Sequence, residues 1–441
     1  MLLPQSSSDN KEEKFDFKSF DMKHRKSVCA QIGIASRDIN AVRPCTPVQS
    51  GMLALYTKSN GYLYCNRTVV RTRTASQLER LQDAWSMAMT RHEMLRTGFV
   101  HLRDQGLSFA MITYKEQSIP LPWVIADNRE SVESEIIRRR QDMFRNLHLP
   151  AWFVVVTVVE SSIEIHFTAH HALFDAQSLN LILSDVVNLY HDGSLRPLVP
   201  NDRVLSHILT RAAQVDADTE RFWTELGADF PVVKFPNLSP VNVDKPRLIT
   251  SSKLSSERLE SIEAQCQSLG VSLQAAGQAA WARLLSAYIG ESDVSFGLVL
   301  SGRDMFPEAQ EAAFPCLVTL PFQCRIEGNN HDLIFSIMRR NAQLGKRQFT
   351  PLSRIQRWFK TDNYLLDILF VYQKLPVKGK QEEFWEVVQE DSEVDVGPSG
   401  LGLGLGLYCG DTDDFGLPTV FRFHRDYTSY RPAGVPLDVP G

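Results

Sequence analysis

The strongest constraint on the fold is a change of apolar period between residues 163 and 190. Residues 163–171 (IEIHFTAHH) alternate strictly between apolar and polar side chains, which predicts a half-buried β-strand. From Ser178 onward the apolar residues recur instead at helical spacing, which predicts an amphipathic helix that ends near Gly193. A strand that runs directly into a helix is typical of α/β architecture.

The same mixture of helices and strands recurs in both halves of the chain. The first half shows helical patterns before this strand. The expected elements of the second half are helices at 259–269 and 273–288, strands at 294–300 and 317–326, a helix at 333–344 and a strand at 366–372. Pro321 has no amide hydrogen, so the strand at 317–326 should lie at a sheet edge or be interrupted. We therefore expect two related α/β lobes, although no sequence repeat connects them.

This pattern divides the chain into four segments. Residues 1–38 are polar, lack a sustained period and are interpreted as an extension. Residues 39–195 should form an N-terminal lobe. Residues 196–390 should hold a crossover, with one short helix near residue 223, and then a C-terminal lobe. Residues 391–441 contain a run of Gly-Leu pairs, which weakens any strand, and are interpreted as an atypical tail that is truncated or disordered.

The composition indicates a globular protein and argues against several functional classes. The chain has 441 residues, of which 43% are hydrophobic, so it can bury a sizeable core and is not globally disordered. Its net charge of −5 argues against a general nucleic-acid binder. No segment reaches the roughly 18–20 apolar residues of a membrane helix, so we expect no membrane contact. The N-terminus lacks the apolar core of a signal peptide, which makes a cytoplasmic location the default.

Metal and disulfide chemistry are not expected. The seven cysteines are odd in number and widely spaced, with no Cys-x-x-Cys pair, which is typical of reduced buried thiols. His166 and His170 share one face of the predicted strand, but no third ligand lies near them in the sequence. We interpret them as structural or surface histidines and expect no metal site.

The residues best suited to chemistry lie at 170–178 (HHALFDAQS), where the strand ends and the helix begins. Alternation places His171 on the apolar face, expected to be buried, and His170 on the opposite face. A histidine that is near neutral at pH 7 can accept a proton from an attacking amine or hydroxyl group. Asp175 can pair with an arginine and lock the turn, or orient the histidine. The alternative is that His171 is a core histidine and Asp175 only a helix cap.

Five segments, in the right order, resemble motifs of nonribosomal peptide synthetase condensation domains. Residues 170–178 resemble the HHxxxDG motif, and residues 91–99 (RHEMLRTGF) resemble the RHExLRTxF motif. Residues 45–53 (CTPVQSGML) resemble the opening motif of fungal members. Residues 301–303 (SGR) and 369–373 (LFVYQ) resemble later fungal landmarks. The resemblance covers about residues 39–390 and is strongest to fungal siderophore synthetases of the ferrichrome type.

The resemblance implies a fold, a reaction and a set of partners. The fold would be α/β, with two chloramphenicol-acetyltransferase-like lobes in a V-shaped pseudo-dimer around a central tunnel. Donor and acceptor peptidyl carrier proteins would dock at the two ends of the tunnel and deliver acyl groups on phosphopantetheine arms. The acceptor amine would attack the donor thioester and form an amide. The chain itself would bind no cofactor and would be a monomer or part of a larger synthetase with neighbouring adenylation domains.

The resemblance also implies roles for individual residues. His171 matches the second histidine of the family motif, which acts as a base or positions the amine. Asp175 matches the structural aspartate, and Arg303 is the candidate for its ion-pair partner. His170 and Ser178 would support the same turn.

Departures from the family pattern leave two alternatives open. Ala176 and Gln177 replace a glycine and an aromatic residue, and residues 314–320 (FPCLVTL) lack an expected asparagine. The region after residue 373 lacks the ordered strands and helices of a full domain. One alternative is therefore a truncated or catalytically impaired remnant that only binds carrier protein. The other is an acyl-CoA-dependent acyltransferase of the same fold.

Overall fold

A computed structural model places most of the chain. It describes residues 15–73, 76–104, 107–160, 162–232, 249–250, 253–254, 259–361, 365–366, 368–374, 383–391, 403–409, 418–419 and 422–423.

The first lobe is built on two sheets. Its strands are β1 (Ile39–Pro44), β2 (Cys65–Thr72), β3 (Thr97–Asp104), β4 (Leu107–Tyr114), β5 (Trp123–Ile125), β6 (Trp152–Val159) and β7 (Ser162–His170). Its helices are α1 (Phe17–Ile32), α2 (Pro47–Lys58), α3 (Leu78–Arg91), α4 (Arg129–Arg145) and α5 (Ala176–Tyr190), with 3₁₀ turns η1 (Ser36–Asp38), η2 (Glu93–Arg96) and η3 (His171–Leu173). The smaller sheet has the order β1-β4-β3.

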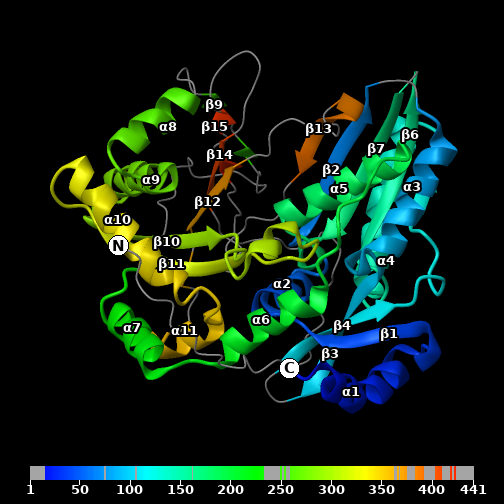
Figure 1. Cartoon of the computed structure of the whole chain (residues 1–441), viewed down its shortest axis with the longest axis horizontal. Helices are drawn as coiled ribbons and strands as arrows, with labels where there is room; N and C mark the ends of the chain where they lie inside the picture. The colour runs from blue at the N-terminus through cyan, green and yellow to red at the C-terminus, as the bar shows by residue number, and fades with distance from the viewer. Residues whose placement is uncertain are drawn as a thin grey trace, which may run out of the picture.

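Helix α6 (Asn201–Ala213) leads from the first lobe to the second (Figure 1). The other helices after it are α7 (Ala217–Ala228), α8 (Leu259–Ser268), α9 (Leu273–Ile289), α10 (Asn330–Gly345) and α11 (Leu352–Trp358), with the 3₁₀ turn η4 (Pro307–Glu311). The longer strands are β10 (Asp293–Leu300), β11 (Val318–Arg325), β12 (Ile368–Lys374), β13 (Trp385–Asp391) and β14 (Leu403–Cys409). Four two-residue strands form two short pairs: β8 (Ile249–Thr250) with β16 (Arg422–Phe423), and β9 (Lys253–Leu254) with β15 (Pro418–Thr419).

The sheet of the second lobe has the order β11-β10-β12-β14. In it β11 is antiparallel to β10, whereas β10, β12 and β14 run parallel. Strand β11 therefore lies at the sheet edge, which confirms the prediction made from Pro321. The α/β class and the order of helices and strands predicted for the second half are confirmed as well.

One strand crosses back between the lobes. The large sheet of the first lobe has the order β13-β2-β7-β6-β5, so its outermost strand comes from the far end of the chain. Figure 1 shows β13 beside β2, and the two are antiparallel. The assignment of all residues from 196 to 390 to the C-terminal lobe is therefore wrong for β13. Such long-range pairing leaves no mark in local sequence, because nothing in residues 385–391 (WEVVQED) specifies the strand with which they pair.

Two more predictions, for the Gly-Leu segment and for the crossover, are corrected. Residues 403–409 of the Gly-Leu segment form β14, so this part of residues 391–441 is not disordered. Its glycines contribute little, but parallel pairing with β12 supplies backbone hydrogen bonds along its whole length. The described part of the crossover, residues 196–232, holds two helices, α6 and α7, in place of one short helix. Most of the remaining tail lies outside the described residues.

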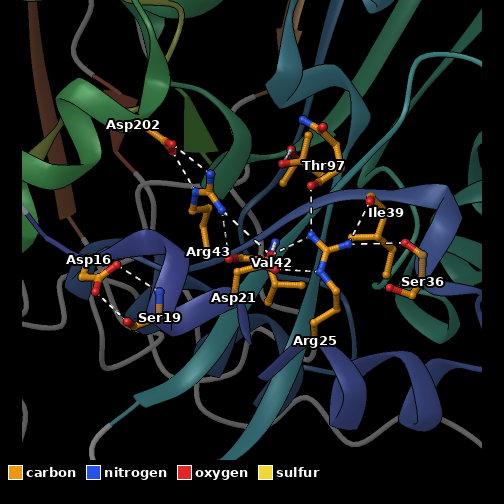
Figure 2. Close-up of polar contacts among 12 residues, drawn as sticks. Asp16, Ser19, Asp21, Arg25, Ser36, Ile39, Val42, Arg43, Thr97 and Asp202 are labelled. Atoms are coloured by element: carbon orange, nitrogen blue, oxygen red, sulfur yellow. Dashed lines mark hydrogen bonds and ion pairs between the residues drawn. The ribbon is translucent and has the colours of Figure 1, made fainter. Parts of the chain in front are cut away.

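The interpretation of residues 1–38 as an extension is wrong for residues 17–32, which form α1; residues 1–14 lie outside the described residues. The sequence pattern does not predict this helix, because its buried side chains are too sparse for a sustained apolar period. They are Phe20, His24 and Val28. Polar contacts fix α1 to β1: the Asp21 carboxylate accepts the Val42 amide at 2.6 Å and also binds Arg25 (Figure 2).

The active-site strand β7 is covered on both faces, so the prediction of a half-buried strand is wrong. On one face the Phe167 ring stacks on Trp85 of α3, with ring centroids 5.5 Å apart. On the other face Nδ1 of His166 accepts a hydrogen bond from Arg67, which also pairs with Glu133 of α4. The polar residues of the alternating pattern are therefore buried and do not mark a solvent face, and Glu164 and His166 pair with arginines there.

Burial of two histidines in β7 should make stability depend on pH. Burial, and then the charge of Arg67, lowers the pKa of His166 to about 4. Burial, and then the neighbouring His171, lowers the pKa of His170 to about 3. The unfolded chain binds protons at these sites from about pH 6.5 downward, whereas the folded chain binds them only as the pH falls to about 4 at His166 and about 3 at His170. Stability is therefore complete above the unfolded pKa and is lost as the pH falls below it.

We expect His166→Gln to flatten this dependence. Each such histidine contributes a slope of about 1.4 kcal/mol per pH unit to the free energy of unfolding, so the variant should lose about that much slope between pH 5 and pH 6. Urea unfolding at several pH values measures the slope. His331→Gln, at a side chain that is 58% exposed, is the matched control and should keep the wild-type slope. Equal slopes in the two variants would contradict the prediction.

Candidate active site

The 3₁₀ turn η3 presents His171 at the end of β7. Nδ1 of His171 lies 2.7 Å from the carbonyl oxygen of Phe174. Because a carbonyl can only accept, Nδ1 carries a proton, so in the neutral form of the ring Nε2 is the acceptor. The His171 ring is partly exposed. The site therefore presents an imidazole ring at an accessible position, held through its Nδ1–H by the Phe174 carbonyl.

His170 lies on the face of β7 predicted for it, which it shares with His166, but this face is buried. Strand β7 ends at His170, which is fully buried, while His171 begins the turn and is the more exposed of the pair. The His170 ring packs edge-on against Tyr56, with centroids 4.5 Å apart. Its Nδ1 accepts the Ala172 amide at 3.0 Å. Alternation misplaced His171 because it carried the strand one residue too far.

Asp175 is at once a helix cap and half of an ion pair, so the two readings of this residue are not alternatives. As N-cap of α5 it forms a capping box with Ser178, whose amide donates to Oδ1 at 2.7 Å. Nη2 of Arg303 lies 2.6 and 2.9 Å from the two carboxylate oxygens. The expected pair of Asp175 and Arg303 is thus present, and both side chains are buried. Helix α5 begins at Ala176, two residues earlier than predicted.

Arg303 also organises the segment that carries η4. Nη1 donates to the carbonyl oxygens of Ala309 and Ala312 at 2.8 and 2.9 Å, and Nη2 donates to that of Phe314 at 2.9 Å. The Cys316 amide in turn donates to Oδ2 of Asp175 at 2.8 Å. Sequence reasoning missed this amide, since a backbone group has no residue type to reveal it.

Gly302 makes the close approach of this segment feasible. Its φ is +63°, and a Cβ on it would lie 2.0 Å from the carbonyl oxygen of Cys316. Any larger residue would therefore both strain the backbone and collide with the segment. This accounts physically for the glycine in residues 301–303.

A second buried carboxylate explains the start of the segment at residues 91–99. Asp185 of α5 is 1% exposed and binds Arg91 at 2.9 Å, Nε2 of His92 at 3.0 Å and Arg196 at 2.6 Å. Burial alone would raise the pKa of Asp185, but His92, Arg91 and Arg196 outweigh it and lower the pKa below its usual value. Arg196 also pairs with Glu311 of η4 at 3.6 Å. The network therefore holds α3, α5 and the η4 segment together.

Within the described ranges, no group of three or more His, Cys, Asp or Glu side chains is arranged to hold a metal ion. No helix in this described part is long and apolar enough to cross a membrane.

Sequence comparison identifies the family. The model of the condensation domain family matches residues 39–399. The chain belongs to this family. The condensation domain is 41% identical over 389 residues to the nonribosomal peptide synthetase sidC of Arthroderma benhamiae, a match covering 87% of this chain and 8% of that protein. It is 25% identical over 328 residues to the hydroxamate-type ferrichrome siderophore peptide synthetase of Schizosaccharomyces pombe, covering 73% of this chain and 6% of that protein. It spans less than a tenth of the length of either relative.

Solved structures support the fold assignment. The condensation domain of the Monacolin K polyketide synthase MokA superposes with a TM-score of 0.69 at 14% identity, covering 87% of this chain and 92% of that one. The first condensation domain of the calcium-dependent antibiotic synthetase gives 0.63 at 15% identity, with the same coverage. The predicted condensation-domain fold and the resemblance to fungal siderophore synthetases are thereby confirmed.

Proposed function

We propose that this condensation domain joins two carrier-bound substrates through an amide bond during assembly of a nonribosomal peptide, and that the product is a siderophore. The single observation that carries the proposal is the His171 ring, whose Nδ1–H is engaged by Phe174 and whose Nε2 is free to accept. The siderophore assignment is supported by the name of the Schizosaccharomyces pombe relative, a ferrichrome siderophore peptide synthetase.

The reaction requires a group that can accept a proton from the amine or hold the amine in place, and His171 can do either. The acceptor amine attacks the carbonyl carbon of the donor thioester, a C–N bond forms, the C–S bond breaks, and the sulfur leaves as a thiolate. The nitrogen must lose a proton, which the departing thiolate finally takes up. Since an α-amine has a pKa of about 7.7–8.0, Nε2 of His171 needs only to accept this proton or to hold the amine through its N–H.

The supporting residues act on the turn and not on substrate in this proposal. The Ser178 hydroxyl acts as both acceptor and donor in the capping box. Its Oγ accepts a hydrogen bond from the Asp175 amide at 2.8 Å and donates one to the Asp175 carbonyl at 3.0 Å. Asp175 and Arg303 bind each other and backbone groups. His170 holds the Ala172 amide. His171 is left as the residue proposed to meet the substrate.

The proposed partners follow from the reaction. A donor and an acceptor carrier protein supply the phosphopantetheine arms, adenylation domains load them, and the domain works as a monomer or within a larger synthetase in the cytoplasm. The share of the relatives that the chain spans supports a place within such a synthetase. The chain would bind no cofactor of its own.

Reconstitution tests the proposal. The full chain is mixed with two carrier domains of the Arthroderma benhamiae relative, a donor bearing an acetylglycyl thioester and an acceptor bearing a glycyl thioester. We expect intact-protein mass spectrometry to show acetylglycyl-glycine on the acceptor. An acceptor whose amine is acetylated is the matched control and should stay unchanged.

Each alternative gives a different result in the same assay. The departures at Ala176 and Gln177 are what favour a remnant that only binds carrier protein; such a chain would bind the loaded carriers and yield no product. An acyl-CoA-dependent enzyme would use acetylglycyl-CoA at least as well as the donor carrier. Either result would overturn the proposal.

A further inference from the structure

The opening motif at residues 45–53 has no role in the proposed reaction, yet one of its side chains reaches the active-site turn. Gln49 of α2 is 2% exposed, and its Nε2 donates to the carbonyl oxygen of Ala172 at 2.8 Å. Ala172 is the residue next to His171 in η3. The contact is buried and joins residues 123 positions apart.

Ala172 is held from two sides by side chains. Its amide donates to Nδ1 of His170, and its carbonyl accepts from Gln49. These two groups belong to the two peptide planes on either side of the Ala172 Cα. The first of these planes also contains the Cα atom and the carbonyl group of His171. Fixing both planes therefore fixes the direction in which the His171 side chain leaves the turn.

We infer that Gln49 is a positioning residue for His171, acting through the carbonyl of Ala172. The inference deepens the proposed function and rests on it in one respect, namely that His171 acts on the substrate. Gln49 touches no reacting atom, so it is not a catalytic residue. It orients the turn on which His171 stands.

The amide group is needed at this position because it donates and accepts at once. Oε1 accepts the Thr46 amide at 2.8 Å and closes the capping box at the start of α2, while Nε2 binds Ala172 and approaches the sulfur of Met111 at 3.5 Å. An ionised carboxylate of the same size could accept from Thr46 but could not donate. A methionine of similar length could do neither.

Kinetics of two variants test the inference. Gln49→Met removes both hydrogen bonds at nearly constant volume and should lower kcat about 10- to 100-fold with KM within about threefold, as expected when a reacting group is misplaced. Thr46→Ala is the matched control. It removes the other half of the same capping box, the 3.2 Å hydrogen bond from the backbone amide of Gln49 to Oγ1 of Thr46, without touching Ala172. It should keep the wild-type kcat.

Gln49→Glu adds a readout that a purely structural role would not move. Burial raises the pKa of the introduced carboxyl, so at acid pH it is neutral and its O–H can donate to the Ala172 carbonyl. As the pH rises the group ionises and the donor is lost. The ratio of variant to wild-type kcat should therefore rise as the pH falls. A ratio that does not change with pH would count against the inference, and it can be measured even if Gln49→Met fails to fold.

Nitrogen NMR of the imidazole ring separates this inference from the proposed function. Wild-type His171, assigned by loss of its signals in His171→Gln, should show a single tautomer with the proton on Nδ1, and folded Gln49→Met should show a mixture. This arm needs no substrate. If the NMR change occurs but His171→Ala keeps activity, the proposed function fails and the positioning of the ring stands. If folded Gln49→Met keeps both the wild-type ring signals and the wild-type kcat, the inference is overturned.

Discussion

His171→Ala should lower the rate of amide formation by about 100-fold or more, within the range that a positioned acid–base group contributes. The free Nε2 is the group that the proposal brings to the attacking amine, and alanine removes it. The fold should survive, because the ring is partly exposed and makes one hydrogen bond, to Phe174, worth about 1 kcal/mol. The loss would therefore appear in the chemical step and not in the amount of folded protein.

A single-turnover reaction between the two loaded carrier domains measures this effect. It should be combined with an unfolding curve for each protein, so that a damaged fold is not mistaken for lost chemistry. His331→Ala, at an exposed histidine of α10, is the matched control and should react like wild type. An unchanged rate in His171→Ala would remove His171 from the mechanism.

The turn around His171 was predictable because local sequence specifies it. A period of two that gives way to helical spacing locates the strand-to-helix junction, and the paired histidines with Asp175 identify the residues suited to chemistry. Pro321 likewise predicted an edge strand from one missing amide hydrogen. Each of these inferences depends on residues that lie within a few positions of one another.

Features that depend on distant parts of the chain could not be predicted in this way. Helix α4 covers the face of β7 that the pattern made polar, and only the folded chain shows that His166 meets Arg67 there. Strand β13 joins the first lobe through pairing with β2. The contact between Gln49 and Ala172 spans most of the first lobe's sequence. The pairing of Asp175 with Arg303 is equally distant, and it was reached through family resemblance.

The second large effect is expected for Arg303→Ala, which should lower the free energy of unfolding by about 3–5 kcal/mol, the usual cost of removing one partner from a buried ion pair. Asp175 would remain buried with only the Ser178 and Cys316 amides as donors. The segment carrying η4 would also lose the donors that now bind three of its carbonyl groups. The free energy of unfolding of Arg303→Lys should lie between those of the wild type and Arg303→Ala, because one ammonium group cannot reproduce the several planar N–H donors of the guanidinium.

The loss of stability in Arg303→Ala should be concentrated where the two lobes meet. Arg303 follows β10 of the second lobe, whereas Phe314 and Cys316 pack in the core of the first lobe. Urea unfolding measures the total loss, and hydrogen exchange at residues 309–316 measures it locally. Arg138→Ala is the matched control, since Arg138 is 56% exposed in its pair with Glu135 and should cost no more than about 1 kcal/mol. Wild-type stability and exchange in Arg303→Ala would mean that the ion pair does not hold the lobes together, and that the cap on α5 alone maintains the turn carrying His171.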